Sequence, residues 1–276
     1  MSSTLNIVGA GRLARTLGRL WTDRGALEVR GVMSRNPDHA QAAVTFIGAG
    51  SVIRDAAEFG PADLWLIATT DGQIAANCGR LAGTGKLAKG SVVFHCSGAL
   101  TSRELASAAQ CGAAVASLHP LASFAEPDRM LERFAGTFCG IEGEARAREV
   151  LVPAFAAIGG IVIDVDAESK ILYHAGAVFA SNYLVAVLES GLQAFELAGI
   201  PRATALAMME RLSKGTLDNV FSVGPLEALT GPVARGDTEL VKRQHAALAQ
   251  RSAPLGELYR QLALAAAKLA GRQIDL

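Results

Sequence analysis

The sequence predicts an α/β protein in which a doubly wound, parallel β-sheet is followed by an all-helical second domain. Three observations predict this class. Short apolar runs alternate with helical patterns over residues 5–165, a glycine-rich turn follows the first of these runs, and only helical periodicity continues from Glu168 onward. Strands that alternate with helices form βαβ units, whose parallel sheet is covered on both faces. We therefore predict two domains, residues 1–166 and 167–276.

The strands of the first domain are expected where apolar residues run almost without interruption. In chain order they cover residues 5–8, 27–33, 63–68, 91–95 and 113–118, and the segments 134–141 and 161–165 extend the same sheet. Helices with apolar residues at helical spacing are expected between them, over residues 12–24, 38–46, 72–81, 102–109 and 144–158. Gly25 ends the first of these helices, and Pro37 precedes the second.

The second domain is predicted to contain four helices and one long turn. The helices are expected over residues 169–197, 202–213, 238–250 and 254–269, and the turn over 224–236. Its most apolar stretch, residues 175–188, is shorter than the roughly 20 residues of a membrane span and is interrupted by Asn182. We interpret it as a helix that is buried on most sides. It is apolar on more faces than one domain covers, which predicts a homodimer.

Composition and charge exclude several classes of function. The 276 residues carry 26 Lys and Arg and 26 Asp and Glu, so the formal net charge is zero. A neutral chain without a long basic block offers no electrostatic basis for binding nucleic acid or an acidic membrane. The four cysteines form no CxxC pair and lie near no histidine at metal-ligand spacing, which indicates reduced thiols and no metal. With no basic, apolar leader at the start, we expect a cytoplasmic protein.

The strongest motif is Gly9-Ala10-Gly11-Arg12-Leu13-Ala14, a GxGxxA sequence between an apolar strand and an amphipathic helix. In that context it is typical of a Rossmann dinucleotide site. Gly9 allows the tight turn, Gly11 lets a pyrophosphate approach the backbone, and Ala14 lets the helix pack closely. The helix N-terminus then offers free N–H groups to the phosphates. The alternative is a tight glycine turn that binds no ligand.

The end of the second strand distinguishes NADP from NAD. An NAD site usually has an acid there for the ribose 2′-hydroxyl. Here Ser34 and Arg35 follow the strand, and Glu28 lies at its opposite end. Because Arg35 can pair with a 2′-phosphate and Ser34 can donate a hydrogen bond, we predict NADP as the cofactor. The alternative is that Arg35 is an ordinary solvated loop residue.

Later strand ends are expected to line the same crevice, because ligands bind at the carboxyl ends of parallel strands. Thr69, Thr70 and Ser97 follow two of these strands and suit a path for the ribose and nicotinamide. Asp71 is interpreted as the N-cap of the next helix. His119 follows a further strand, and we include it among the candidate catalytic residues.

The long helix that opens the second domain carries the candidate reaction centre. Lys170, Tyr173 and His174 lie at positions i, i+3 and i+4, so they share one face of the helix. Hydride transfer to a carbonyl or imine needs a proton donor, and Lys170 is the first candidate and His174 the second. The alternative places the lysine on the exposed side and the histidine in the helical core. Ser181 and Asn182 add polar groups to an apolar helix and are predicted to line the substrate site.

Four segments together resemble one family: 117–121, 170–174, 181–183 and 229–237. The chain is similar over essentially its whole length to the Rossmann-like proteins with a DUF2520 helical domain. These are distant relatives of pyrroline-5-carboxylate reductase, the F420-dependent NADP oxidoreductases and the 6-phosphogluconate and β-hydroxyacid dehydrogenases. The resemblance implies an NADP-type Rossmann domain and a helical dimerisation domain like the C-terminal domain of 6-phosphogluconate dehydrogenase. It supplies no substrate.

The resemblance also bears on individual residues. In the β-hydroxyacid dehydrogenases a catalytic lysine is followed four residues later by asparagine. Lys170 matches the lysine, whereas His174 stands where the asparagine would be. The pyrroline-5-carboxylate reductases present a threonine-bearing loop to the substrate from a neighbouring subunit, and residues 230–237 occupy a comparable place. Arg235, within that segment, is a candidate for binding a substrate carboxylate in bidentate geometry.

These observations predict an NADP(H)-dependent oxidoreductase that acts by hydride transfer on a small carbonyl, hydroxy or imine acid. The second domain is expected to close the site. The principal alternative is a non-catalytic dinucleotide-binding or regulatory protein, because Rossmann domains host many functions. A further alternative is chemistry like that of prephenate dehydrogenase or the imine reductases on the same scaffold.

Overall fold

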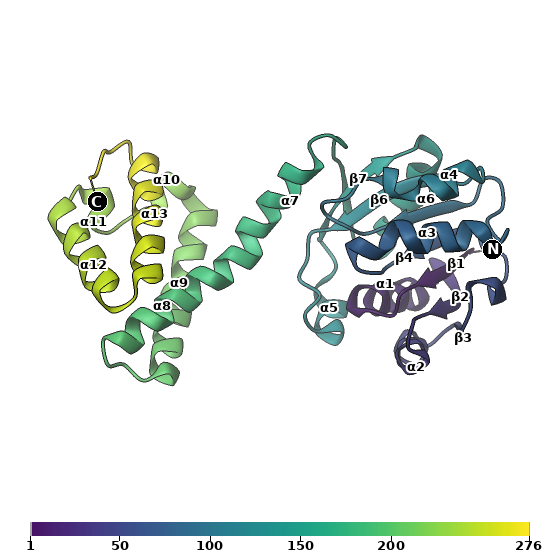
Figure 1. The fold of residues 1–276 in the computed structure, drawn as a ribbon, viewed down its shortest axis with the longest axis horizontal. Coiled ribbons are helices and arrows are strands. Elements are labelled where there is room, and N and C mark those ends of the chain that lie inside the picture. Colours follow the sequence, from purple (N-terminus) through teal and green to yellow (C-terminus); the bar gives the residue numbers. More distant parts are fainter. Residues whose placement is uncertain (1, 276) are drawn as a thin grey trace. The chain divides into compact units, whose positions relative to one another are not determined.

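An eight-stranded sheet forms the centre of the N-terminal part of the protein (Figure 1). The computed structural model describes residues 2–275, and their packing divides the chain into two units between Phe179 and Ala180. The strand order is β3-β2-β1-β4-β5-β6-β7-β8. The strands are β1 Ser3–Val8, β2 Leu27–Met33, β3 Ser51–Ile53, β4 Leu64–Ile67, β5 Val92–His95, β6 Ala114–Pro120, β7 Phe138–Gly143 and β8 Ile161–Asp164. The predicted α/β class with a Rossmann-type sheet is confirmed.

One pair of strands departs from the predicted parallel sheet. β6 and β7 are antiparallel, with Pro120 opposite Cys139, whereas every other neighbouring pair is parallel. The chain between them returns into the sheet from the edge at which β6 ends, and this connection contains the short helix α5, Pro127–Arg133. A parallel neighbour would need a crossover to the opposite edge. The direction of β7 therefore depends on the path of a connection that no periodicity in the sequence reveals.

Helices cover both faces of the sheet and produce two buried cores. On one face lie α1 Arg12–Asp23, α2 Pro37–Ile47, α5 and α6 Ala145–Ala156, where the Trp21 ring meets Phe155 edge to face at 5.2 Å. On the other lie α3 Ile74–Gly83 and α4 Ala106–Gln110, together with three 3₁₀ turns, η1 Ala56–Glu58, η2 Asp71–Gln73 and η3 Ser102–Leu105. The side chains of both cores are almost completely buried, and their close packing holds the sheet that carries the site in one rigid conformation.

The first unit also includes the start of the helix that was predicted to open the second domain. This helix runs as α7 Lys170–Val178, a π-helical turn Phe179–Tyr183 and α8 Leu184–Leu197. By contact, α7 belongs to the first unit, although the change from alternating strands and helices to helices alone comes just after β8. The domain boundary at residues 166/167 stays a prediction about the architecture, and the packing boundary lies further along the chain.

The second unit is entirely helical. It contains α8, α9 Arg202–Val223, α10 Pro225–Ala228, α11 Pro232–Arg235, α12 Thr238–Arg251 and α13 Ala253–Leu269. α9 is longer than the predicted 202–213, because helical backbone continues until Gly224, whose φ of +86° ends it. The predicted turn 224–236 holds the two short helices α10 and α11.

The interpretation of residues 175–188 as a helix buried on most sides is wrong for the single chain. Phe179 is 69% exposed and Val185 67% exposed. By length and composition the continuous helix Lys170–Leu197 could cross a membrane, and it is the one such helix in the described residues. This is weak evidence for a span, and the first turn of that helix packs on the sheet through the buried Lys170.

Candidate active site at the carboxyl ends of the strands

The glycine motif forms a corner at the end of β1 that only glycine fits. Gly9 has φ +119°, and a Cβ there would lie 2.2 Å from the carbonyl oxygen of Ala68 on the neighbouring strand. Gly11 is different: its backbone is extended, and a Cβ would meet nothing within 4 Å. Gly11 is also the N-cap of α1, and no side chain caps that helix or adds an acid to its first turn. The corner is thus an open anion site at a helix N-terminus.

A cleft of about 440 Å³ opens at this corner. Seven predicted cofactor residues line it: Gly9, Ala10, Gly11, Ser34, Arg35, Thr69 and Thr70. Arg12, Leu13 and Ser97, which were predicted with them, are not among its lining residues. His39, Arg54, Gln73, Asn77 and Arg80 line it as well and were not predicted. Arg54 follows β3, which is too short to recognise from sequence, and Arg80 comes from α3, so no local pattern marks either residue.

The lining of the cleft is basic. Arg35, Arg54, Arg80 and His39 contribute side chains to it, and no Asp or Glu is among the residues that line it. Arg80 donates a hydrogen bond of 2.6 Å to the Asn77 side chain, which orients its guanidinium. A dianionic phosphate is the ligand that such a group of cations attracts most strongly.

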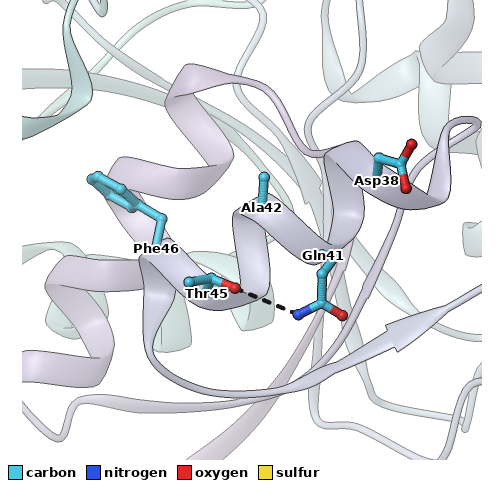
Figure 2. Close-up of a pocket in the computed structure, with 5 residues that line it drawn as sticks. All are labelled: Asp38, Gln41, Ala42, Thr45 and Phe46. Atoms are coloured by element: carbon cyan, nitrogen blue, oxygen red, sulfur yellow. Dashed lines mark hydrogen bonds between the residues drawn. The ribbon is translucent and has the colours of Figure 1, made fainter.

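A second surface hollow lies on α2 and has none of these properties. Figure 2 shows its five lining side chains, with the Gln41 amide donating to the Thr45 hydroxyl. Its residues come from one helix, without a strand end or a glycine turn among them. It is therefore not a candidate for the dinucleotide site.

Asp71 does not cap the following turn, so that interpretation is wrong. The N-cap of η2 is Thr70, and the Asp71 carboxylate instead accepts a hydrogen bond of 2.9 Å from the Ser97 hydroxyl. Ser97 Oγ in turn accepts from the backbone N–H groups of Ala99 and Leu100. The pair ties the end of β4 to the loop after β5 and holds that loop beside the cleft.

Lys170 lies in a buried polar centre behind this loop. It is 1% exposed, and its ammonium group donates to Ser117 Oγ and lies 3.5 Å from Glu142 Oε1. Glu142, on β7, also accepts hydrogen bonds from the backbone N–H and the hydroxyl of Ser102, at 2.7 and 2.8 Å. Burial lowers the pKa of Lys170, and the Glu142 carboxylate opposes that shift. Glu142 was not predicted, although a lone carboxylate within a buried strand is a recognisable signal.

His119, Tyr173 and His174 meet over Gly98. The ring centres of His119 and His174 are 5.6 Å apart, and the Tyr173 hydroxyl lies 3.2 Å from His119 Nδ1. A Cβ on Gly98 would lie 2.3 Å from His174 Nδ1 and 2.9 Å from His119 Nε2, so a side chain there would displace both rings. His174 Nδ1 is buried and has no hydrogen-bond partner within residues 2–275.

Burial controls the protonation of this group. It lowers the pKa of His119 to about 4, with smaller effects of the same sign from His174 and Lys170. It raises the pKa of Tyr173 to about 12. At neutral pH the centre therefore holds a neutral imidazole next to a protonated phenol. Both groups can hydrogen-bond to a bound ligand.

The three predicted substrate residues belong to the second unit. Ser181 and Asn182 are in the π-helical turn, Arg235 ends α11, and all three are exposed. Their role in binding substrate stays a prediction. The four cysteines are free, as predicted; Cys78 and Cys139 are buried, Cys96 is half-buried and Cys111 is exposed.

Fold and cleft together define a Rossmann-type protein with the architecture of NAD(P)-dependent oxidoreductases. Residues 137–266 match the model of the family described as a domain of unknown function, DUF2520. The resemblance predicted from the sequence is thus confirmed for the segment that carries its most specific motifs. A comparison with curated proteins gives no match.

Solved structures share the fold over nearly the whole chain. A protein from Thermotoga maritima is 26% identical with a TM-score of 0.73, covering 97% of this chain and 98% of its own. A candidate NADP oxidoreductase from Bacteroides fragilis is 20% identical with a TM-score of 0.78 and the same coverage. A pyrroline-5-carboxylate reductase from Coxiella burnetii is 19% identical with a TM-score of 0.61, covering 100% of both chains. These likenesses concern the fold.

Proposed function

We propose that this protein is an NADP(H)-dependent oxidoreductase that transfers a hydride between the nicotinamide and a small carbonyl, hydroxy or imine acid. The observation that carries the proposal is the acid-free cleft at the glycine corner, with Arg35, Arg54 and Arg80 among the residues that line it. Rossmann-type neighbours named for NADP support the choice of cofactor. NADPH, when bound, supplies the hydride.

The residues present fit that cofactor. The backbone at Gly9–Gly11 and the N-terminus of α1 suit the pyrophosphate. No other atom lies within 4 Å of a Cβ built at Gly11, so a phosphate can approach the backbone there. Ser34 and Arg35 follow β2, where the adenosine ribose of a dinucleotide is held in this class of fold. Arg54 and Arg80 add positive charge to the lining of the same cleft. The absence of an acid among the lining residues supports NADP over NAD.

A hydrogen bond to the reacting group is assigned to the histidine centre at the adjacent strand ends. If the Tyr173 hydroxyl donates to His119 Nδ1, the proton of the neutral imidazole is on Nε2, the nitrogen that packs against Gly98. That N–H can donate a hydrogen bond to the oxygen or nitrogen of a substrate and stabilise the negative charge that develops as the hydride arrives. The proton that completes the reduction comes from water, because an imidazole that is already neutral does not give one up. His174 Nδ1 is buried against Gly98 and has no hydrogen-bond partner in the described residues, so it reaches a substrate only if the ring moves. Lys170, the first donor predicted from the sequence, has its ammonium group hydrogen-bonded to Ser117.

Calorimetric titration with NADPH and NADH tests the cofactor assignment. We expect NADPH to bind more tightly, and Arg35→Ala to weaken NADPH about 10- to 100-fold while changing NADH little, because a charge-assisted contact to phosphate contributes about 1.5–3 kcal/mol. Arg30→Ala is the matched control, because Arg30 lies in β2, the strand before Arg35, but pairs with Glu28 and does not line the cleft. Gly11→Val should abolish binding of both nucleotides. Equal affinity of the wild type for the two would contradict the NADP assignment.

Turnover separates an enzyme from a dinucleotide-binding protein without catalysis. NADPH oxidation would be followed with a panel of 2-keto acids and cyclic imines. His119→Gln should lower the rate with any substrate found by about 10²- to 10³-fold, the usual effect of removing a hydrogen-bond donor to the charge that develops in the transition state. Tight NADPH binding without turnover on the whole panel would favour the non-catalytic alternative.

A further inference from the structure

Lys170 and Glu142 join three separate elements of the first unit. Lys170 is the first residue of α7, and Glu142 lies in β7, the strand next to the edge strand β8. Ser102, which donates two hydrogen bonds to Glu142, is the first residue of the 3₁₀ turn η3. Ser117 on β6 accepts from the lysine and passes a hydrogen bond of 3.2 Å to the carbonyl of Ser97. The side chains of Lys170 and Glu142 are 2% and 7% exposed. The pair therefore fixes the start of α7 on the sheet from within.

The same helix turn carries the residues that meet His119. Tyr173 and His174 lie three and four positions after Lys170, on the face that it shares. Their rings contact His119 at 5.7 and 5.6 Å between centres, and His174 Nδ1 stands directly over Gly98. A rotation or shift of the first turn of α7 would move both rings away from these positions. The placement of the histidine centre thus depends on what holds Lys170.

We propose that Lys170 is a positioning residue that, with Glu142, holds Tyr173 and His174 against His119 and Gly98, and that it is not the proton donor. The inference rests on the proposed function for the meaning of the histidine centre. The ammonium group is enclosed, and its contacts are to Ser117 and Glu142. His174 Nδ1, over Gly98, has no hydrogen-bond partner among the described residues.

Single and double substitutions of a buried ion pair have different effects on stability. Removing one partner leaves an uncompensated buried group and is strongly destabilising, whereas replacing both partners by neutral side chains of similar size is often harmless. A proton donor behaves otherwise, because its loss cannot be repaired by removing a neighbour. The variants are Lys170→Met, Glu142→Gln and the double variant. The exposed pair Arg103–Glu168, substituted in the same way, is the matched control, because it also joins η3 to the segment before α7.

The first readout is the pH titration of the histidine rings by NMR in the full chain saturated with NADP⁺. His119 should titrate near pH 4 in the wild type, with its pKa lowered by burial. Glu142→Gln should raise this value toward 6.5, because the ring becomes hydrated when α7 shifts. Lys170 lowers and Asp71 raises the pKa of His119, so by charge alone the double variant, which lacks the ammonium group, would keep a raised value. The double variant therefore separates the two explanations. The double variant should return to about 4, and the control variants should not move it.

The second readout is the turnover rate with whichever keto acid or imine is accepted. Each single variant should lose at least tenfold in kcat, and the double variant should recover to within about threefold of the wild type. A double variant as slow as Lys170→Met would overturn the proposal and restore the lysine as donor. So would a value for His119 that is unchanged or lowered in Glu142→Gln.

The failure of the proposed function would look different. In that case the wild type binds neither nucleotide in the calorimeter, while the histidine titration, repeated without NADP⁺, still reports whether the pair positions the rings. If the pKa of His119 still changes in the single variants and returns to the wild-type value in the double variant, the anchoring role of Lys170 stands and only its catalytic meaning is lost.

Discussion

The two units of this chain differ in how completely each buries its own apolar residues. The first unit has an aromatic core on one face of its sheet, around Trp21, and another on the opposite face, around Trp65. The largest buried cluster in the described part of the second unit consists of Leu192, Ala205 and Met209. Large apolar side chains on the second unit are exposed, among them Phe221 at 85%. The first unit has two extensive cores and exposes large apolar side chains mainly on α7, such as Leu172 at 73%, whereas the second has a small core and a larger apolar surface.

The difference indicates which surface of the second unit a partner would cover. Exposed apolar groups cluster on the long helices α8 and α9, for example Val185, Leu206, Leu212 and Phe221. We propose that a second copy of the chain covers them, in agreement with the homodimer predicted from the sequence.

The largest expected effect comes from a tight corner in the first unit. Gly9→Ala should cost about 3–5 kcal/mol, since its Cβ would meet the Ala68 carbonyl oxygen at 2.2 Å and its φ of +119° is strained for alanine. Gly199→Ala in the second unit should cost only about 1–2 kcal/mol, because its φ of +85° is strained but a Cβ there meets nothing within 4 Å. Urea unfolding measures both. Equal costs would show that the close packing of the first unit has been overestimated.

The apolar surface gives the next largest effect. Phe221→Asp should convert the wild-type dimer to a monomer, weakening association 100-fold or more, because a charge would be buried in an apolar interface. Sedimentation velocity at several concentrations measures this. Val152→Asp on α6 of the first unit, also an exposed apolar position, is the control and should leave the dimer intact. A wild type that sediments as a monomer would remove the proposed cover.

Sequence and structure agree most closely where the signal is local. β2 has its predicted bounds, and α1 begins at the predicted Arg12, because continuous apolar runs and Gly25 determine these elements within a short window. The three residues of β3 and the short helix α5 were not predicted, since neither is long enough to show a period. The shared face of Lys170 and His174 followed from helical spacing.

The contacts of Lys170 could not be predicted from the sequence. Glu142 lies 28 residues before Lys170 and Ser117 lies 53 before it, so only the folded sheet brings the three together. The same holds for Arg54 and Arg80, which join Arg35 at the cleft from different elements. A local motif located the site, and long-range packing determined which side chains complete it.

Acid should destabilise the first unit specifically. Burial lowers the pKa of both His95 and His119 to about 4, and both residues lie in that unit. Between pH 6.5 and 4 these two histidines are protonated in the unfolded chain and neutral in the folded chain. The free energy of unfolding therefore falls as the pH falls through this window, and the loss levels off below pH 4. Each histidine contributes at most about 3–4 kcal/mol, which is 2.5 pH units at 1.36 kcal/mol per unit.

Urea unfolding of the wild type at pH 7 and pH 4.5 measures this loss. His119→Gln should remove about half of it, and His39→Gln, at an exposed position, should remove none. The loss should appear in the transition of the first unit. A loss confined to the second unit would contradict the origin in these two buried imidazoles.

The smallest effect tests whether the two units unfold separately. Asn36 caps α2 in the first unit by accepting from the backbone N–H of Asp38, and Asp237 caps α12 in the second by accepting from that of Leu240. Replacing either by alanine should cost about 1 kcal/mol, because each leaves one helix N–H without its partner. The same free energy should lower the midpoint of the shorter second unit by about 4–8 °C and that of the first by about 2–4 °C, since a smaller unit has a smaller entropy of unfolding. Ser169→Ala, at an N-cap whose side chain makes no capping bond, should shift neither midpoint. Scanning calorimetry at one protein concentration measures all three variants, and a single shared transition that both caps lower equally would show that the second unit, once covered, unfolds together with the first.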